Sequence, residues 1–549
     1  MIKRNYFVLA FAVYVMLSFT FYSFCSSGKN GSNVAKSSDY QVFLKLFKDF
    51  RDFTKPNVID GVPDYSPQAM SEQYGKLNKF QKWLAAIDIS NWPVSQQVDY
   101  HLVRAEMNGL EFYHRVLRPW SRDPCFYLQS QAGAGPVFYG TLEIPRNFPL
   151  SEGKQAELKV KLQAIPKIYN KAKENLREAS GDLALIALHF LNEEIAIYRN
   201  ISSELAKYHP DLVAYADKAK AAVEDYGTWL EENKDKMTEP AGVGVENYNW
   251  WMKNVQLVPF TWEELMAIME NEYKRAISAL KLEQYRNSGL PQVEPVKNEA
   301  EYRQRYYKYQ KHLLNFLHEK EILTIPDYLK PLPPKAWKDF PSRQGGNVRD
   351  FFEQCEDRNP LPSPLIHEFL GHHFDELCFQ RDSRPIRGAR RLFAMDMIRS
   401  EGLAFGLEEI FMRAGLFDKY PRGREINYIM MAFRAIRALA DLKLHSHEFN
   451  LKDSFEFCYE QTPYHWMLPD GFEAWYEMET TLRFPGWHMG MVIGKLQLLS
   501  LMADQAQQLG DEFNIRQFMD KFRGAGMIPI SLIRWEITGL SDEIEKMLK

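Results

Sequence analysis

A short stretch in the second half of the chain carries side chains that could do chemistry. Residues 367–373 read His-Glu-Phe-Leu-Gly-His-His, so a carboxylate follows the first of two closely spaced imidazoles. In zinc hydrolases two such histidines bind Zn²⁺, and the adjacent glutamate acts as general base. Zinc lowers the pKa of a bound water to about 7, which makes it a nucleophile at neutral pH. We therefore predict one Zn²⁺ ion held by His367 and His372, with Glu368 as the catalytic base.

The spacing of these histidines requires an unusual helix. Each residue of a regular α-helix turns by about 100°, so side chains four positions apart lie about 40° apart and share a face. His367 and His372 are five positions apart, which separates them by about 140° on the same geometry. One extra residue taken up as a π-bulge would bring the two rings together. Gly371, directly before His372, is a permissive place for that distortion.

A downstream acidic segment offers the third ligand. Residues 400–409 read Ser-Glu-Gly-Leu-Ala-Phe-Gly-Leu-Glu-Glu, which is expected to be helical. Glu401 and Glu408 are two turns apart on one side of that helix. A carboxylate from a second helix completes a zinc site of two histidines and one glutamate. We predict that Glu401 is this ligand, while Glu408 lies behind the ligands and orients a histidine through its free ring nitrogen.

On these motifs the chain resembles the bacterial domain of unknown function 885 family, which is grouped with the gluzincin metallopeptidases. That family carries a His-Glu-x-x-Pro-Gly-His-His core, a later Glu-Gly-Trp-Ala-Leu-Tyr-x-Glu helix and a Pro-Gly-Gln segment. The matching stretches lie within about residues 240–540 and are His367 to His373, Glu401 to Glu408, and Pro485 to Trp487. The resemblance implies a mainly α, multi-helix gluzincin-like fold with a central cleft and few short strands, a zinc ion and a peptide substrate.

Two departures from the family pattern bear on the site. The proline before Gly371 is missing, so the core is similar to the His-Glu-x-x-Gly-His motif of the dipeptidyl-peptidase III family, whose two histidines both bind zinc. This favours His372 as the second ligand, although by count His373 stands where the first histidine of the longer motif would. His373 therefore remains an alternative ligand or a neighbour of the ligands. Several family residues near Pro485 are also replaced, by Thr480, Thr481, Trp487, Met491 and Val492. These replacements imply altered substrate binding or lost turnover.

Peptide hydrolysis also needs a donor for the developing oxyanion besides the metal. The C-terminal half offers several aromatic and histidine side chains that could donate: His445, Tyr464, His465, Tyr476 and His488. We choose His488 as a catalytic residue because it follows Pro485 in a glycine-rich segment. Arg437 is expected to pair with Asp441 one turn on, rather than to clamp a substrate carboxylate.

The function predicted from these residues is a zinc-dependent metallohydrolase, a peptidase that uses metal-activated water and a glutamate base. Two alternatives remain. One is a catalytically inactive relative that still binds metal, and the other is a non-haem iron protein, because two histidines and one carboxylate also describe the iron facial triad. Glu368 favours the hydrolase over the iron protein. A net charge of −4 without a basic stripe argues against nucleic acid as a partner.

The elements that must position these residues are helices. Apolar residues recur at helical spacing, with steps of three and four, at Leu212, Tyr215, Ala219, Val223, Tyr226 and Leu230. We expect a long helix over about residues 203–236, restarted after Pro210 because the proline ring displaces a backbone hydrogen bond. Strand-like alternation is scarce, so the fold class is predicted to be mainly α.

Helix boundaries suggest how the chain is divided. Thr261 and Glu264 form a capping-box signature at the start of an apolar-periodic run. Proline- and glycine-rich breaks lie at residues 239–244 and 331–364. We expect two helical lobes, residues 39–240 and, with the metal site, residues 241–549.

The N-terminus predicts export. A lysine–arginine pair precedes a mostly apolar run over residues 6–24, and a stretch rich in Ser, Gly, Asn and Lys follows. Residues 1–25 are expected to be a signal peptide or membrane anchor, and residues 26–38 a flexible tether. Cys25 could instead carry a lipid. The protein is therefore expected in the periplasm, in the cell envelope or outside the cell, where its N-terminus could tether it to a membrane.

The cysteine content excludes a disulfide scaffold. Five cysteines are too few for one, and no C-x-x-C pair occurs. Four cysteines remain when Cys25 is set aside: Cys125, Cys355, Cys378 and Cys458. They could form one or two disulfides, or stay free and buried.

Overall fold

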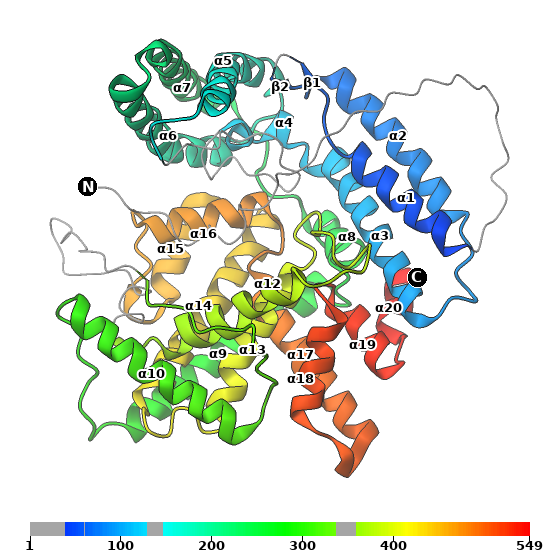
Figure 1. The fold of residues 1–549 in the computed structure, drawn as a ribbon, viewed down its shortest axis with the longest axis vertical. Coiled ribbons are helices and arrows are strands. Elements are labelled where there is room, and N and C mark those ends of the chain that lie inside the picture. The colour runs from blue at the N-terminus through cyan, green and yellow to red at the C-terminus, as the bar shows by residue number, and fades with distance from the viewer. Residues whose placement is uncertain (1–38, 60, 129–146, 336–357) are drawn as a thin grey trace. The chain divides into compact units, whose positions relative to one another are not determined.

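The computed structural model describes residues 39–59, 61–128, 147–335 and 358–549. Helices make up nearly all regular structure in this part of the chain (Figure 1), which confirms the mainly α fold class. The sheet found there is one antiparallel hairpin of β1 (Val58–Ile59) and β2 (Val62–Pro63). The predicted leader, tether and Cys25 lie outside the described residues. None of the described helices is long and apolar enough to cross a membrane.

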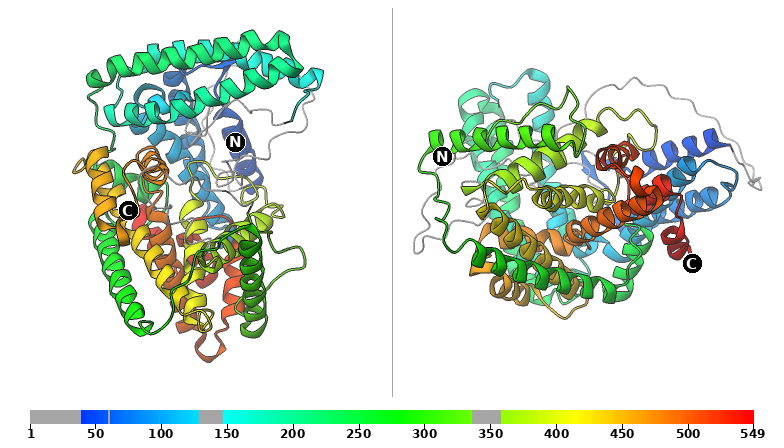
Figure 2. Two further views of the ribbon diagram at one scale, coloured as in Figure 1. Left: turned by 90° about the vertical axis from the view of Figure 1, so that its left-hand side faces the viewer. Right: turned by 90° about the horizontal axis from the view of Figure 1, so that it is seen from below.

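The N-terminal half of the described chain is built from long helices joined by short turns. Its elements are α1 (Tyr40–Phe53), α2 (Pro67–Ala85), α3 (Val94–Phe112), the π-helix η1 (Tyr113–Leu117), α4 (Pro119–Arg122), η2 (Pro124–Tyr127), α5 (Glu152–Asn175), α6 (Gly181–Tyr208), η4 (Pro210–Leu212), α7 (Val213–Asn233) and η5 (Lys234–Lys236). Helix α7 packs against both α5 and α6, and the cyan to green helices of this part lie together at the top of the left view in Figure 2. Helices α1, α2 and α3 form a second packed group.

Local sequence signals between residues 203 and 264 are largely confirmed. The helix expected around Pro210 does restart there, although α6 begins at Gly181, well before the expected start. Thr261 and Glu264 make both hydrogen bonds of the capping box, at 3.3 and 2.8 Å. Tyr215 is half-buried, and the rest of the apolar face is buried as the spacing predicts: Leu212, Ala219, Val223, Tyr226 and Leu230.

The C-terminal half carries the predicted metal motifs. Its elements are α8 (Val245–Asn254), α9 (Trp262–Arg286), α10 (Glu299–Lys320), the π-helix η6 (Leu361–His373), α12 (Phe374–Phe379), α13 (Met397–Arg413), α14 (Arg422–His445), α15 (Leu451–Gln461), η7 (Pro463–His465), α16 (Phe472–Arg483), α17 (Met489–Leu509), η8 (Gly510–Glu512), α18 (Ile515–Ala525), α19 (Ile530–Thr538) and α20 (Asp542–Leu548). Helix α13 packs against η6 and against α17, so the histidine and glutamate motifs lie on neighbouring helices.

One predicted boundary is wrong. The break expected to run to Pro364 ends at Pro360, because η6 already begins at Leu361 and contains Pro362 and Pro364. The first residues of a helix have no intrahelical partner for their N–H groups, so proline costs little there. The first bond of the π-helix joins Leu365 N to Pro360 O, at 3.1 Å.

Close backbone contact fixes the position of α13 on α17. A Cβ atom added to Gly402 would overlap the backbone of Gly494, and one added to Gly494 would overlap the Ile398 carbonyl. Side chains at either position would force the helices apart. Helix α13 therefore has a defined depth against α17, and this contact also sets the position of Glu401, the neighbour of Gly402.

Buried ion pairs and backbone bonds connect the two halves of the described chain. Arg387 donates to Asp99 at 2.8 Å, and Arg483 donates to Asp123 at 2.7 Å. Near the break expected at residues 239–244, Gly244 N donates to His445 O at 2.8 Å. Cys125, Cys378 and Cys458 are free thiols, while Cys355 lies outside the described residues.

Candidate metal centre

The histidine motif lies on a π-helix. Element η6 is a 13-residue π-helix, longer than the single bulge expected from the sequence. It ends with Phe374 N bonded to Phe369 O, five residues back. Since a π-helix repeats its hydrogen bonds at i and i+5, residues five apart lie on one face. The side chains of His367 and His372 therefore point the same way.

Three candidate ligand side chains converge at this point. The Nε2 atoms of His367 and His372 are 3.1 Å apart. Glu401 Oε2 is 3.3 Å from His367 Nε2, and Glu401 Oε1 is 3.5 Å from His372 Nε2. Two ligands bound to one tetrahedral zinc at about 2.05 Å would lie about 3.3 Å from each other. The three side chains therefore have the mutual spacing of a zinc ligand set.

The hydrogen bonds around the rings direct lone pairs into the centre. His367 Nδ1 is 2.9 Å from Glu408 Oε1, and His372 Nδ1 is 3.1 Å from Ser400 Oγ. When each Nδ1 donates to its oxygen, both Nε2 atoms present lone pairs to each other and to Glu401. Glu401 Oε2 is buried and accepts no hydrogen bond from the described residues. Converging acceptors of this kind fit a cation, so the donor set suits Zn²⁺.

The electrostatics of the centre also favour positive charge. Burial lowers the pKa of His372, but the nearby carboxylates of Glu401, Glu368 and Asp375 together outweigh burial and raise this pKa to about 9. Burial raises the pKa of Glu401, but the two imidazoles outweigh it and hold this pKa well below its usual range. Without a metal the centre therefore retains a proton at neutral pH. A divalent cation would displace that proton on binding.

Glu368 is the second carboxylate at the centre. One of its oxygens and the ring nitrogens of His367 and His372 all lie within 4.8 Å of one another. Glu368 is half-buried, and no hydrogen bond or ion pair joins it to another described residue. Glu401 lies closer to both rings, with oxygens 3.3 and 3.5 Å from the two Nε2 atoms, so it is placed to serve as a ligand. Glu368 remains available to accept a proton.

Behind His367 lies a buried ion pair that sequence reasoning found only in part. Glu408 is fully buried and lies where the sequence placed it, against His367 Nδ1. Arg434 on α14 binds both carboxylate oxygens of Glu408 at 2.8 Å. Burial raises the pKa of Glu408, but the charges and hydrogen bonds of Arg434 and His367 together outweigh burial and leave this pKa lowered. Arg434 was not singled out from the sequence. The sequence could have indicated such a partner, because a glutamate predicted to be buried needs a positively charged side chain beside it.

Gly371 sets how closely η6 approaches α13. Its expected role was to permit the helix distortion, yet its φ is not in the left-handed region. Instead, an added Cβ would lie 2.5 Å from Ala404 Cβ and 2.9 Å from Ala404 Cα. Two small residues thus bring η6 and α13 into close contact, and this contact carries His372 to Glu401.

His373, His445 and His488 make their ring contacts and hydrogen bonds with residues other than the converging ligands. His373 is half-buried and stacks on the Phe369 ring, with centroids 6.3 Å apart. His488 is buried; its Nε2 donates to Glu477 O at 3.0 Å, and burial lowers its pKa to about 4. His488 Nδ1 therefore carries a lone pair, and in this tautomer it cannot donate to an oxyanion. His445 donates to Thr481 O at 3.0 Å.

The expected pairing of Arg437 with Asp441 is wrong. Arg437 instead donates to Glu477 on α16 at 2.6 Å. Asp441 accepts from Tyr248 Oη at 2.8 Å and from Gly486 N at 3.3 Å. The helix α16 packed on α14 supplies a partner that the local i,i+4 rule could not anticipate.

A substitution of Glu408 tests its assigned role. Glu408→Gln keeps the shape of the side chain but removes the charge that orients the imidazole. We expect zinc affinity to fall about 10- to 100-fold, measured by competition with a chelating dye. Glu409→Gln is the matched control, because Glu409 is also buried but pairs with Arg275 and Lys495 at 2.9 and 2.8 Å. Equal losses of affinity in both variants would contradict the role of Glu408.

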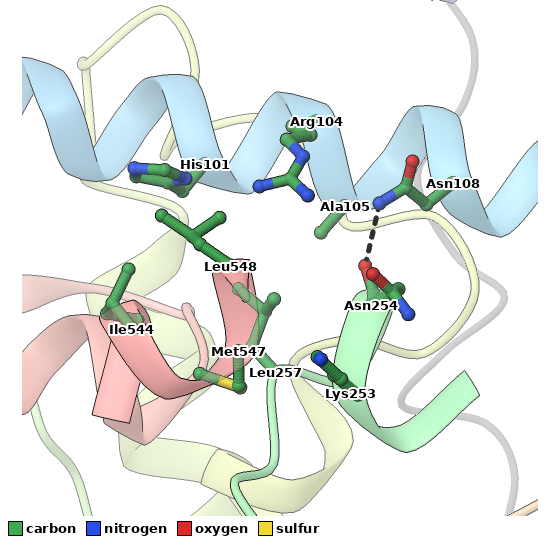
Figure 3. Close-up of a pocket in the computed structure, with 10 residues that line it drawn as sticks. All are labelled: His101, Arg104, Ala105, Asn108, Lys253, Asn254, Leu257, Ile544, Met547 and Leu548. Carbon is green, nitrogen blue, oxygen red and sulfur yellow. Dashed lines mark hydrogen bonds between the residues drawn. The ribbon is translucent and has the colours of Figure 1, made fainter. Parts of the chain in front are cut away.

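A hollow between α3, α8 and α20 lies away from this centre. Figure 3 shows its lining, in which Asn108 donates to Asn254 O at 3.0 Å. None of its lining residues belongs to the metal centre. It is therefore not assigned to the same chemistry.

Comparison with known proteins supports the fold and part of the resemblance. Residues 328–537 match the family described as "Bacterial protein of unknown function (DUF885)", a narrower span than the expected 240–540. A "putative lipoprotein of unknown function" from Shewanella oneidensis has 14% identity and a TM-score of 0.67, and the match covers 90% of this chain and 97% of that one. A "putative lipoprotein" from Colwellia psychrerythraea has 13% identity and a TM-score of 0.68, with 92% and 99% covered. No curated protein matches the chain.

Proposed function

We propose that this protein is a gluzincin-type, zinc-dependent hydrolase of peptides, with the ion held by His367, His372 and Glu401. The observation that carries the proposal is the convergence of two imidazole nitrogens and one buried carboxylate, 3.1 to 3.5 Å from one another. This spacing is that of ligands around a tetrahedral ion. The dipeptidyl-peptidase III-like spacing of the two histidines agrees with it.

The reaction divides among the side chains of the centre. When bound, zinc would polarise the substrate carbonyl and lower the pKa of a water to about 7. Glu368 takes the proton of the attacking water and later passes it to the leaving amine. Glu408 and Ser400 hold the two rings so that their Nε2 atoms stay directed inward. His488 has a free Nδ1 lone pair and a pKa lowered by burial to about 4, so in this tautomer it can accept a hydrogen bond but not donate one.

Glu368 distinguishes this proposal from the iron protein, and the segment around Pro485 distinguishes it from the inactive relative. A facial triad of iron needs the two histidines and one carboxylate but not a second carboxylate. Glu368, close to both rings and without a partner among the described residues, favours hydrolysis. An inactive relative would keep the metal ligands but lose substrate binding around Pro485.

We also propose a place for the protein in the cell envelope. The apolar run over residues 6–24 and Cys25 fit export with retention by a lipid or a membrane anchor. The descriptions of both structural relatives support this location.

Metal analysis combined with peptide hydrolysis tests the proposal. We expect the purified full chain to contain about one zinc per molecule, and to cleave members of a mixed peptide library followed by mass spectrometry. Removal of the metal with 1,10-phenanthroline should abolish cleavage, and one equivalent of Zn²⁺ should restore it. The reason is that the proposed reaction depends on the ion for carbonyl polarisation.

The other outcomes identify the alternatives. Restoration by Fe²⁺ but not by Zn²⁺ would support the iron protein. A zinc-loaded chain that cleaves no peptide in the library would overturn the peptidase proposal in favour of the inactive relative. Glu401→Gln is expected to lower the zinc content, whereas Glu376→Gln on the next helix should not.

A further inference from the structure

A buried group of three charged residues lies at the end of the π-helix that carries the histidine motif. Asp375 on α12 accepts a hydrogen bond from Arg523 on α18, at 2.7 Å, and another from Arg399 on α13. All three are buried, with exposed fractions of 2%, 7% and 1% for Asp375, Arg523 and Arg399. We call these three residues the Asp375 cluster. None of them is a proposed metal ligand or takes part in the proposed reaction.

The Asp375 cluster is next to both metal-binding motifs in the sequence. Asp375 comes three residues after His372, and Arg399 comes two residues before Glu401. The ion pair between Asp375 and Arg399 therefore ties the segment that carries one proposed ligand to the helix that carries another. Because both partners are buried, the pair is weakly screened by solvent and salt.

The end of the π-helix presents a backbone carbonyl to the cluster. In a π-helix the N–H of residue i bonds to the carbonyl of residue i−5, whereas in an α-helix it bonds to that of residue i−4. One carbonyl is therefore passed over where η6 changes into α12. Phe374 N bonds to Phe369 O and to Gly371 O, and the carbonyl of Leu370 lies between these two in the sequence. Arg523 Nη2 donates to Leu370 O, so a side chain from α18 binds the carbonyl at this junction.

Arg523 thus holds the histidine motif on both sides of His372. Its Nη2 atom is bonded to Leu370 O, two residues before His372, and its Nη1 atom to Asp375, three residues after it. Its guanidinium carbon lies 4.0 Å from the centroid of the Phe374 ring. The donors of a guanidinium point in fixed directions in one plane. These contacts therefore fix the end of η6 relative to α18.

The cluster carries one positive charge more than it carries negative charge. Two guanidinium groups share the single carboxylate of Asp375, and burial lowers the pKa of Arg523. A positive charge near a metal centre repels a divalent cation. The charge of Arg523 therefore opposes zinc binding, and Arg523 can favour zinc only through the geometry that it imposes on η6.

We propose that the Asp375 cluster positions the metal centre, by holding His372 on η6 at the distance from Glu401 that a zinc ion requires. Gly371 and Ala404 limit how closely η6 and α13 approach each other, and the cluster keeps them from separating. This inference rests on the proposed function in taking zinc as the ion of the centre, but it does not depend on peptide hydrolysis.

Arg523→Met tests the inference, because the charge and the geometry of Arg523 have opposite effects on zinc binding. Methionine removes the charge and all the donors, and it leaves Asp375 paired with Arg399, so no buried charge loses its only partner. Loss of the positive charge alone would tighten zinc binding. We instead expect the zinc affinity of the full chain to fall about 10- to 100-fold, measured by competition with a chelating dye. Co²⁺ bound in place of zinc should show an altered visible absorption, because this absorption depends on coordination geometry.

The matched control is Arg51→Met on α1. Arg51 and Arg391 also share one buried carboxylate, that of Glu106, at 2.8 and 3.0 Å, and Arg51 also donates to a backbone carbonyl, that of Arg390. We expect this variant to keep the zinc affinity and the Co²⁺ absorption of the wild type. Arg523→Lys keeps the charge but not the fork of donors, so it should weaken zinc binding about threefold or more. It decides the question if Arg523→Met lacks a cooperative thermal melt.

The outcomes separate this inference from the proposed function. Unchanged or higher zinc affinity in a folded Arg523 variant overturns the inference, as does lower affinity with an unchanged Co²⁺ absorption. Equal losses of affinity in Arg523→Met and Arg51→Met overturn it as well, because a general loss of stability would then explain both. A wild type that binds zinc but cleaves no peptide overturns the peptidase, while the variants still decide the inference. A wild type that binds no zinc overturns both.

Discussion

Glu368→Gln is expected to reduce peptide hydrolysis by about 10²- to 10⁴-fold, the usual contribution of a general base. Glutamine has nearly the same shape, but its amide cannot accept the proton of the attacking water. Because Glu401 rather than Glu368 touches both imidazole Nε2 atoms, zinc content and the thermal unfolding temperature should stay close to those of the wild type. The measurements are kcat/KM on a cleaved peptide, metal content and a thermal melt.

The matched control is Glu376→Gln on α12. Glu376 is a half-buried acid one helix further along, where it pairs with Arg390, and loss of a partly exposed pair costs at most about 1 kcal/mol. We expect its activity to remain within a few-fold of the wild type. Full hydrolysis by the Glu368→Gln variant would rule out the proposed mechanism. Loss of zinc from that variant would instead reassign Glu368 as a ligand.

Gly371→Ala is expected to weaken zinc binding by about 10- to 100-fold, although the substituted residue cannot touch the metal. The new methyl group would lie 2.5 Å from Ala404 Cβ, so η6 must move away from α13. That movement separates His372 from Glu401, and displaced ligand supports typically cost this much affinity. The overlap should also lower the free energy of unfolding by about 1–3 kcal/mol. Chelator competition and urea denaturation measure the two effects.

A second substitution distinguishes this cause from a general effect of alanine. Ala404→Gly removes the methyl group that the new side chain meets, so the double variant with Gly371→Ala should recover part of the zinc affinity. Gly524→Ala on α18 is the control, since nothing lies within 4 Å of its Cβ position. It should be neutral or slightly stabilising. Unchanged zinc affinity in the Gly371→Ala variant would show that the contact between η6 and α13 does not set the metal geometry.

Local sequence signals predicted some features of the fold correctly and others only in part. The sequence predicted both the buried helix face that ends at Leu230 and the helix cap at Thr261. Both features depend on interactions within one or two helical turns, so the local sequence is enough to predict them. The π-helical distortion followed from the five-residue spacing alone, but its extent did not, because it depends on contacts of η6 with other helices. The boundary predicted at Pro364 was wrong for a similar reason. Proline destabilises the interior of a helix but not its first turn, so the effect of Pro362 and Pro364 depends on where the helix starts.

Residue types and spacing, together with the family resemblance that favoured His372 over His373, were enough to nominate His367, His372, Glu401 and Glu408 as one group, because two short motifs contain them all. Only the tertiary structure brought atoms of His367, His372 and Glu401 within 3.1 to 3.5 Å of one another. It also paired Glu408 with Arg434, and Arg437 with Glu477. The physical reason for this difference is the separation along the chain of the residues that interact. Helix periodicity and caps act between residues a few positions apart, whereas the distance between two helices is set by close contacts such as Gly371 on Ala404, whose partners are far apart in the chain.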